Sequence, residues 1–244
     1  MAERTLRVCA LYPDLMNIYA DRGNLLLLER RCQWRGIGFE VVAAGLGEGI
    51  DPEAHDLFYI GGAQDRDQAL CAQDMVDTKR DALHAAADSG RVVLAVCGGY
   101  QLLGHHYQLG AERIPGVGLV DLHTVREDGP RLIGNVAIEV RLPGLDGPRV
   151  LAGFENHGGR THLGAGEQPL GRVLAGHGNN CADRREGVIR GSVVGTYLHG
   201  PLLPKNAWFA DWLIATALGA GPLDPLDDAL EDAAHASARR AAGV

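Results

Sequence analysis

One stretch of the sequence combines residue types that suit covalent catalysis. Residues 91–96 form an apolar, valine-rich run, which predicts a buried parallel strand. Cys97 follows this run, two glycines come next, and a helical pattern begins at Tyr100. A strand, a sharp turn and a helix would place Cys97 on an elbow, where the glycines allow strained backbone and close approach of a substrate.

The helix predicted after Cys97 would favour a nucleophilic role for the thiol. A helix N-terminus carries partial positive charge and unpaired N–H groups. We therefore expect it to lower the pKa of the Cys97 thiol and to hold a developing oxyanion. The alternative is a buried structural cysteine beside a tight strand-to-helix turn. The two glycines directly after the cysteine favour the catalytic interpretation.

A cysteine nucleophile needs a base, and His199 is the best placed of the ten histidines. It follows a strand predicted at residues 193–198 and precedes Gly200 and Pro201. Its imidazole would take the thiol proton and later deliver it to a leaving amine. Position alone does not single out one histidine among ten, so this pairing needs further support.

Strands and helices alternate through the first half of the chain. Predicted strands cover residues 6–12, 39–43, 57–60 and 91–96, and predicted helices cover 25–35, capped by Asn24, and 66–89, stopped by Gly90. This α/β alternation predicts a mostly parallel sheet with helices on both faces. Ligands bind beyond the carboxyl ends of such strands, so Gly61, Gly62 and Cys97 are expected to share one cleft.

The second half changes character, because glycines are frequent and short strands replace helices. The candidate strands are residues 118–125, 132–141, 150–154, 171–175, 187–190 and 193–198. They predict an antiparallel extension of the sheet. An amphipathic helix is predicted over 205–218, with Pro204 at its start. We expect one domain over residues 5–219, followed by a tail over 220–244 that forms a peripheral helix or is partly disordered.

Composition narrows the class of protein. The 244 residues are 46% hydrophobic, which is ample for a core, and the net charge of −8 without a long basic run argues against nucleic-acid binding. The five cysteines are widely spaced and form no C-x-x-C pair, which indicates a reducing compartment. We expect no signal peptide and no transmembrane segment, and hence a cytoplasmic protein that a partner could bring to the inner membrane face.

Four motifs, in chain order, resemble one enzyme family. They are residues 60–68 (IGGAQDRDQ), 97–104 (CGGYQLLG), 153–161 (GFENHGGRT) and 198–206 (LHGPLLPKN). Over residues 5–219 the chain resembles class I, triad-type glutamine amidotransferases of the cobyric-acid-synthase subgroup. Within that subgroup the motifs are most similar to the glutaminase subunits of lipid II isoglutaminyl synthases.

The resemblance implies a glutaminase that hydrolyses L-glutamine to glutamate and ammonia and needs no cofactor of its own. It also implies a Mur-ligase-like partner subunit that uses ATP and Mg. This partner would amidate the D-glutamate of lipid II to D-isoglutamine in peptidoglycan synthesis. Two alternatives are an amidotransferase subunit for a cobalamin-type or other biosynthetic synthetase, and a non-catalytic interaction module of the same fold. The intact Cys97 and His199 favour an enzyme over the module.

Residue by residue, the resemblance assigns Cys97 as the nucleophile and His199 as the base. It assigns Arg131 to binding of the substrate glutamine. An arginine suits that role because its guanidinium can clamp an α-carboxylate with two parallel hydrogen bonds. Without the resemblance, a solvated arginine at a strand edge would be the default interpretation of Arg131.

Three further residues are candidates for the substrate site. The backbone N–H groups of Gly62 and Gly98 are the expected oxyanion donors. Gln101 is a candidate for the wall of the substrate pocket, with a helix-surface position as the alternative. The spacings of the histidines match no zinc pattern, so we expect no metal site.

The sequence departs from the family at the third member of the triad. Class I enzymes commonly carry a glutamate two residues after the histidine, and this chain has Pro201 there. A proline cannot orient an imidazole. Glu155, another carboxylate of this chain or a carboxylate from the partner would have to take that role, or the pair would work as a dyad.

Overall fold

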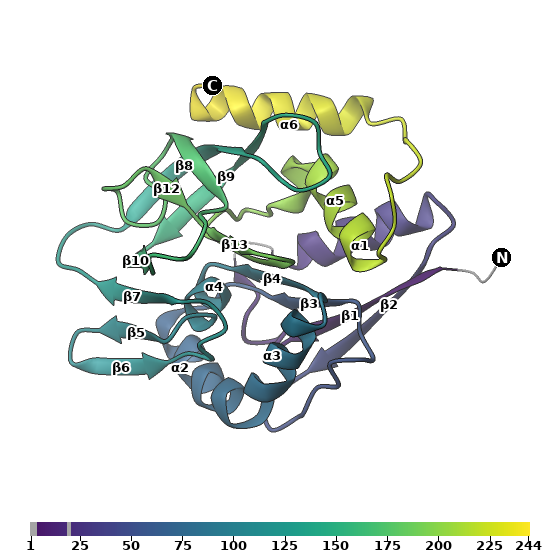
Figure 1. Ribbon diagram of the computed structural model, residues 1–244. Helices are drawn as coiled ribbons and strands as arrows, with labels where there is room; N and C mark the ends of the chain where they lie inside the picture. Colours follow the sequence, from purple (N-terminus) through teal and green to yellow (C-terminus); the bar gives the residue numbers. More distant parts are fainter. Residues whose placement is uncertain (1–3, 19–20) are drawn as a thin grey trace.

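The computed structural model of the protein describes residues 4–18 and 21–244, and its centre is a six-stranded sheet (Figure 1). The strand order is β13-β14-β4-β3-β1-β2, and every neighbouring pair runs parallel except β13 and β14. The strands are β1 (Thr5–Leu11), β2 (Gly38–Ala44), β3 (Leu57–Ile60), β4 (Val92–Val96), β13 (Val188–Arg190) and β14 (Val193–Thr196). The predicted mostly parallel sheet is therefore confirmed.

Helices cover both faces of this sheet, as predicted. On one face lie α1 (Arg22–Gln33) and α5 (Ala207–Ala217), and on the other lie α2 (Asp65–Asp74), the π-helical segment η2 (Met75–Lys79) and α3 (Arg80–Asp88) (Figure 1). All residues of β3 and β4 are buried. This burial explains why both strands are uninterrupted apolar runs in the sequence.

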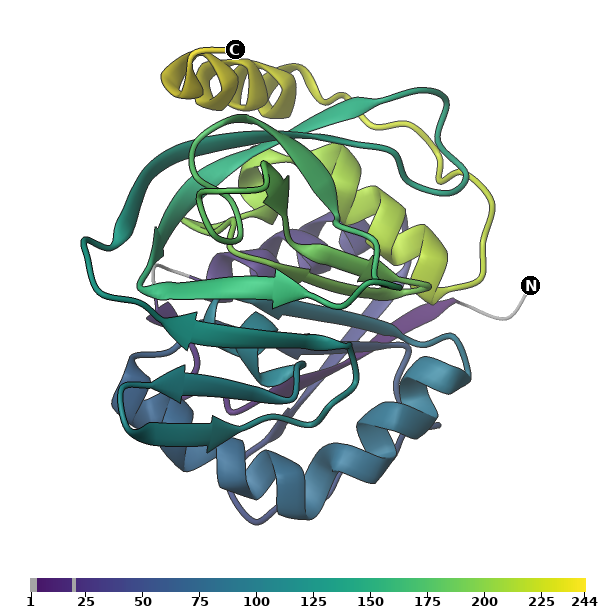
Figure 2. The ribbon, with the colours of Figure 1, turned by 60° about the vertical axis from the view of Figure 1, so that its left-hand side comes forward.

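Two smaller sheets make up the second half of the chain (Figure 2). The first has the order β10-β7-β5-β6 and consists of β5 (His106–Leu109), β6 (Glu112–Pro115), β7 (Leu122–Arg126) and β10 (Gly159–Leu163). The second has the order β12-β11-β8-β9 and consists of β8 (Leu132–Val140), β9 (Arg149–His157), β11 (Gly171–Ala175) and β12 (Arg185–Glu186). Their pairs are antiparallel except β5 with β7, which confirms the antiparallel extension.

The N-terminus of α1 differs from the prediction. The helix begins at Arg22, so the prediction that Asn24 caps it is wrong. Asn24 lies in the first turn with its side chain buried, donates to the Tyr59 hydroxyl at 2.9 Å and accepts the Leu203 N–H at 2.8 Å. The asparagine therefore fastens α1 to β3 and to the segment that follows His199.

The long helix predicted at 66–89 is interrupted by η2. There the buried Lys79 ammonium donates to Asp74 Oδ2 at 2.6 Å and to the Gly45 carbonyl at 3.0 Å. It also lies 4.5 Å from the centre of the Tyr12 ring. The π-helical turn brings Lys79 to these three partners, which satisfy a cation that would otherwise be costly to bury. The helical run ends at Gly90, as predicted, with φ at +81°.

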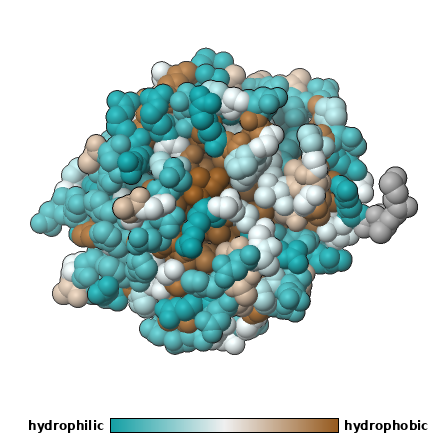
Figure 3. Space-filling view, in the orientation of Figure 1, coloured by the Kyte–Doolittle hydropathy of each residue, from teal (hydrophilic) through white to brown (hydrophobic). Residues whose placement is uncertain are grey.

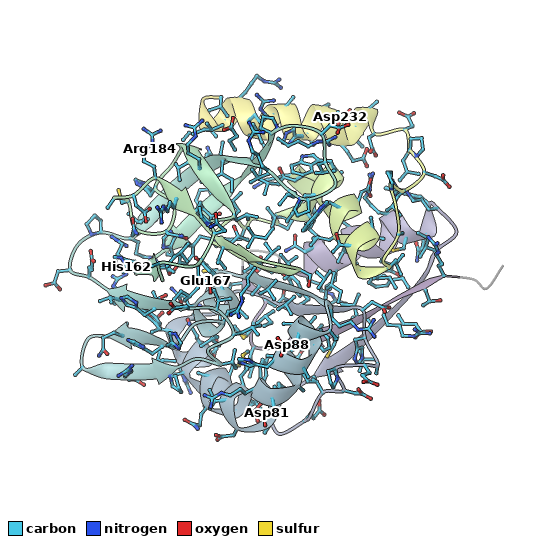
Figure 4. All side chains as sticks on the ribbon, viewed as in Figure 1. Asp81, Asp88, His162, Glu167, Arg184 and Asp232 are labelled. Atoms are coloured by element: carbon cyan, nitrogen blue, oxygen red, sulfur yellow. The ribbon has the colours of Figure 1, made fainter. Side chains whose placement is uncertain are left out.

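The tail forms a helix, α6 (Ala229–Ala242), which lies across β8, β9 and the short 3-10 turn η3 (Leu203–Lys205) at the top of Figure 1. Asp232, labelled in Figure 4, is on this helix. Two polar contacts hold α6 in place. His235 Nδ1 lies 2.9 Å from the Lys205 carbonyl oxygen, and Asn135 Nδ2 donates to the Ala241 carbonyl at 3.0 Å. Residues 229–242 of the tail therefore form a helix that packs against the rest of the chain.

The surface in the orientation of Figure 1 is mostly hydrophilic, with hydrophobic residues gathered near the centre of the face (Figure 3). Across the described part of the chain, no helix has the length and apolar composition that a membrane span requires.

Arg31 joins three elements. Its side chain has no exposed surface, and its guanidinium donates to both carboxylate oxygens of Asp211 in α5 and of Asp228, the residue before α6. These bonds lower the pKa of Asp228. Arg35 adds a second guanidinium on Asp211 at 2.8 Å. The start of the tail is therefore fixed to α1 by charge-assisted bonds.

We predict that Arg31→Ala lowers the free energy of unfolding by about 3–5 kcal/mol, because removing one partner leaves buried charge uncompensated. Urea denaturation followed by circular dichroism measures this change. Arg30→Ala is the matched control, since Arg30 is exposed and its side chain bonds only to Gln33, at 2.9 Å, within the described residues. An equal effect of the two substitutions would contradict the role given to Arg31.

Candidate active site

Cys97 lies on the predicted elbow. It directly follows β4, and α4 (Gly98–Leu102) begins at the next residue. Its backbone has φ at +51° and ψ at −106°, which is strained for a residue with a side chain. The Cys97 N–H donates to the Thr196 carbonyl at 2.8 Å, which ties the elbow to the end of β14. Such strain persists only where the surroundings hold it, and it is common at active sites.

The predicted direction of the Cys97 pKa shift is wrong. The pKa of the thiol is raised to about 12, chiefly by burial and secondly by the charge of Asp21. The Gly98 N–H donates to the sulfur and lowers the pKa, as expected of a helix start, and Arg131 also lowers it. The cost of burying a thiolate exceeds both of these contributions, because Cys97 is only 6% exposed.

His199 reaches the same edge of the sheet as Cys97. The strands β14 and β4 are parallel neighbours, with Thr196 opposite Val96. His199 follows three residues later, where its backbone N–H and carbonyl both bond to Phe154 at 3.0 Å. The structure therefore brings the two predicted catalytic residues together from adjacent strands.

The environment of His199 keeps its imidazole neutral. The pKa of His199 is lowered to about 3, chiefly by burial and further by the charges of nearby groups, among them Lys205 and Arg131. A neutral imidazole is the form that accepts a proton. The two predicted catalytic side chains are therefore a thiol and a neutral imidazole, so the predicted chemistry would need proton transfer to accompany attack by the sulfur.

Sequence reasoning missed the carboxylate that holds the end of β14. Glu186 is fully buried, accepts the Tyr197 N–H at 2.6 Å, and accepts the Thr196 hydroxyl at 3.0 and 3.1 Å. Burial raises its pKa to about 8. These bonds fix the strand two residues before His199. The only signal in the sequence is a glutamate beside Gly187 at a predicted strand start, which is too common to be informative.

Arg131, the predicted substrate-binding residue, is held by Asn156. Its Nε donates to Asn156 Oδ1 and its Nη2 to the Asn156 carbonyl, both at 2.8 Å. The side chain remains exposed. Its charge lowers the pKa of both Cys97 and His199, so the guanidinium is close to the reacting pair. Asn156, which sequence reasoning did not single out, thus orients an arginine that is accessible to a ligand.

The N–H groups of the two predicted oxyanion donors, Gly62 and Gly98, both have partners within the protein. The Gly98 N–H donates to the Cys97 sulfur and the Gly62 N–H donates to Asp21 Oδ2 at 2.7 Å, and the oxyanion role of both stays a prediction. The next N–H, that of Ala63, lies 3.0 Å from where a Cβ on Gly98 would be, and it bonds to no acceptor in residues 4–18 or 21–244. A Cβ on Gly62 would lie 3.2 Å from Cys97 Cβ, so glycine is needed there for space.

Gln101 is not a helix-surface residue. It is 4% exposed, its Oε1 accepts from Gln68 Nε2 at 2.9 Å, and its Nε2 donates to the Tyr197 hydroxyl at 3.0 Å. The Gln68 amide also donates to the Gly98 carbonyl at 3.3 Å. Gln101 therefore belongs to a buried amide network behind the elbow, and its place in the pocket wall stays a prediction.

Pro201, at the position of the missing glutamate, packs against the first turn of α1. A Cβ on Gly23 would lie 2.9 Å from Pro201 Cγ. Glu155 has no exposed surface, and its carboxylate accepts the N–H groups of His177 and Gly178 at 2.6 and 3.0 Å. It also lies 3.8 Å from His157 Nε2. Glu155 thus shapes the 176–178 loop, and its role as third triad member stays untested.

Three histidines form a row on the outer side of the first small sheet. The ring centres of His106 and His123 are 5.8 Å apart, and those of His123 and His162 are 5.3 Å apart. His162 lies on β10, among the antiparallel strands (Figure 4). Among the residues that the structure describes, no group of three or more His, Cys, Asp or Glu side chains could hold a metal ion.

Comparison with known proteins identifies the family. The model of the CobB/CobQ-like glutamine amidotransferase domain matches residues 7–207. The subunit GatD of the glutamine-hydrolyzing lipid II isoglutaminyl synthase of Staphylococcus aureus is 41% identical over 206 residues, which cover 84% of this chain and 81% of that protein. Its counterpart from Streptococcus pneumoniae is 38% identical over 214 residues, which cover 87% and 80%.

One further protein matches over a shorter part of the chain, and one solved structure shares the fold at low sequence identity. A probable cobyric acid synthase of Methanopyrus kandleri is 43% identical over 128 residues, which cover 47% of this chain and 24% of that protein. The structure of PurLQS from Thermotoga maritima matches with a TM-score of 0.60 at 19% identity, covering 88% of this chain and 95% of that chain, which shows a shared fold. With the family match spanning the elbow, Arg131 and His199, this chain belongs to the CobB/CobQ-like glutamine amidotransferases.

Proposed function

We propose that the protein is the glutamine-hydrolysing subunit of a lipid II isoglutaminyl synthase. The observation that carries the proposal is the strained Cys97 elbow beside the buried, neutral His199, with Arg131 close to both. The two GatD relatives at about 40% identity support the choice of this amidotransferase over others.

The geometry supports a stepwise mechanism. Arg131 clamps the α-carboxylate of glutamine and presents the side-chain amide to Cys97. His199 takes the thiol proton as sulfur attacks the amide carbon, and the N–H groups of Gly98 and Ala63 hold the oxyanion. His199 then donates the proton to the departing ammonia. Water, activated by the same imidazole, hydrolyses the thioester to glutamate.

We predict that Cys97→Ala abolishes glutamine hydrolysis and leaves the fold intact, because Gly98 and Gly99 rather than sulfur shape the elbow. Ammonia release measures the activity, and thermal unfolding checks the fold. Cys181→Ala is the matched control, since Cys181 is the exposed free cysteine outside the site. An electrophilic glutamine analogue should label Cys97 alone. Equal labelling of the buried Cys9 or Cys71 would contradict the elbow argument.

We predict that Arg131→Ala lowers kcat/KM for glutamine by about 10²-fold or more, because each hydrogen bond to a charged group contributes about 1.5–3 kcal/mol. Arg131→Lys should rescue poorly, since a point charge cannot reproduce the guanidinium fork. Steady-state kinetics measures both. Arg172→Ala, an exposed arginine that pairs with Glu139 at 3.2 Å, is the control. Near-wild-type kinetics of Arg131→Ala would mean that another residue holds the substrate.

The proposed partner is a MurT-like, Mur-ligase-type subunit that binds ATP and Mg and reaches lipid II. The ammonia released at Cys97 would amidate D-glutamate there, on the cytoplasmic side of the membrane. A cobalamin-type synthetase as partner is the alternative. Copurification of the partner from the native host, followed by identification of its amidated product, distinguishes the two.

The partner is also a candidate source of the third triad carboxylate, which the family commonly carries two residues after the histidine. Pro201 occupies the family position of that carboxylate, and the carboxylates of Glu155 and Glu186 are engaged in holding backbone N–H groups. Lys205 and Arg131 place positive charge near His199. That charge would attract an acidic side chain from outside.

We predict weak glutaminase activity of the isolated subunit and strong stimulation when the partner docks. Loss of the orienting carboxylate costs a serine triad about 10⁴-fold in kcat, so completing the triad has a large effect. Glutamine turnover with and without the partner measures the stimulation. Changing each acidic partner residue near His199 to its amide then identifies the donor. Full activity of the isolated subunit would instead favour Glu155 as an internal third member.

A further inference from the structure

The turn at residues 61–63 runs beside the nucleophile elbow and is held from its far side at two points. The Gly62 N–H donates to Asp21 Oδ2 at 2.7 Å. The Gly62 carbonyl accepts the Ile18 N–H at 3.2 Å. Both polar groups of one glycine are therefore bonded to the segment that leads into α1, and the peptide planes on either side of Gly62 are fixed.

Because peptide bonds are planar, the two hydrogen bonds to Gly62 also fix the direction of the Ala63 N–H. The described residues contain no cis peptide bond, and in a trans peptide the carbonyl and the N–H point to opposite sides. Because the Gly62 carbonyl points to Ile18, the Ala63 N–H points the other way, toward the elbow. It accordingly lies 3.0 Å from where a Cβ on Gly98 would be.

From this geometry we infer that Asp21 is a positioning residue for the oxyanion hole. Its carboxylate, together with the Ile18 N–H, holds Gly62 so that the Ala63 N–H faces the amide oxygen of a substrate bound at Cys97. The inference rests on the proposed glutaminase reaction, because it names a residue that prepares the same site.

The surroundings of Asp21 favour a positioning role over an electrostatic role. Asp21 is fully buried, and its Oδ1 has no hydrogen-bond partner in the part of the chain that the structure describes. Leaving a carboxylate oxygen buried without a partner is costly. The charge also raises the pKa of Cys97 and so opposes thiolate formation. Electrostatics therefore disfavours a carboxylate at position 21. The hydrogen bond that Asp21 accepts from the Gly62 N–H explains its presence instead.

The main chain of Asp21 is itself anchored, which makes it a firm support. Its carbonyl accepts the Tyr59 hydroxyl at 3.1 Å and the Asn24 N–H at 2.9 Å. The Asn24 side chain in turn accepts the Leu203 N–H at 2.8 Å. One turn thus supports the oxyanion loop on one side and the segment after His199 on the other.

Two substitutions of Asp21, measured on the complex of the protein with its ligase partner, test the inference. Asp21→Ala removes the acceptor, and loss of one oxyanion donor costs about 10²–10³-fold in kcat. We expect kcat for glutamine hydrolysis to fall about 10²-fold while KM stays within about threefold, because Arg131 still binds the substrate. Asp21→Asn keeps an acceptor oxygen for the Gly62 N–H, so its kcat should stay within about tenfold of wild type.

Alkylation of Cys97 by iodoacetamide at pH 8 provides a readout that needs no oxyanion hole. Both substitutions remove the charge that raises the Cys97 pKa, so the thiolate fraction grows and alkylation should be as fast as in wild type or faster. Peptide mapping confirms that buried Cys9 and Cys71 stay unlabelled and that the fold is retained. Glu48→Gln is the matched control, because Glu48 is exposed and also accepts a backbone N–H, that of Gly45 at 2.6 Å, away from the site. It should leave both rates unchanged.

The positioning role would be supported if kcat falls in Asp21→Ala but not in Asp21→Asn, and if Cys97 alkylation is preserved in both. Wild-type kcat in Asp21→Ala would overturn it. An equal loss in Asp21→Asn would overturn it as well, because the charge rather than the acceptor would then matter. A parallel fall of kcat and alkylation would show a collapsed site and would also count against the inference. Absence of glutamine hydrolysis by the wild-type complex would instead contradict the proposed function.

Discussion

The parallel pairing of β4 with β14 is the constraint on which the site depends. It sets Val96 opposite Thr196, so that the residues after the two strands emerge at one edge of the central sheet. The Cys97 N–H completes the pairing by donating to the Thr196 carbonyl. The Thr196 hydroxyl in turn donates to the Glu186 carboxylate, which holds the same end of β14. A shift of one residue in this register would exchange the faces of β14 and remove the base from the nucleophile.

Around this edge, buried polar groups serve as supports more often than as reactants. Asn156 orients Arg131, and Asn24 holds the segment after His199. Glu155 shapes the 176–178 loop and Glu186 the end of β14. Each makes hydrogen bonds to backbone or to another side chain, which suits a site whose groups need fixed directions in a medium of low dielectric constant. The reacting groups are few, and the polar side chains that direct them are more numerous.

Much of the fold could be predicted from the sequence, because strands covered on both faces are continuous apolar runs and helices end at glycines such as Gly90. The hairpin of β5 and β6 was missed, since its four-residue strands are half exposed and carry little apolar pattern. Cys97 could be proposed from the strand end and the two glycines that follow it, whereas His199 also needed the family resemblance. Asp21 could not, because its partner Gly62 lies 41 residues away, and the pKa of Cys97 depends on burial that no local pattern contains.

The high pKa of Cys97 affects how readily peroxides oxidise this residue. Peroxides oxidise the thiolate form of cysteine to sulfenic acid and then to irreversible products, and they react slowly with the neutral thiol. Since burial raises the pKa of Cys97 to about 12, the neutral thiol is its favoured form. Burial and a high pKa therefore both disfavour oxidation of Cys97, whereas Cys181 is an exposed sulfur.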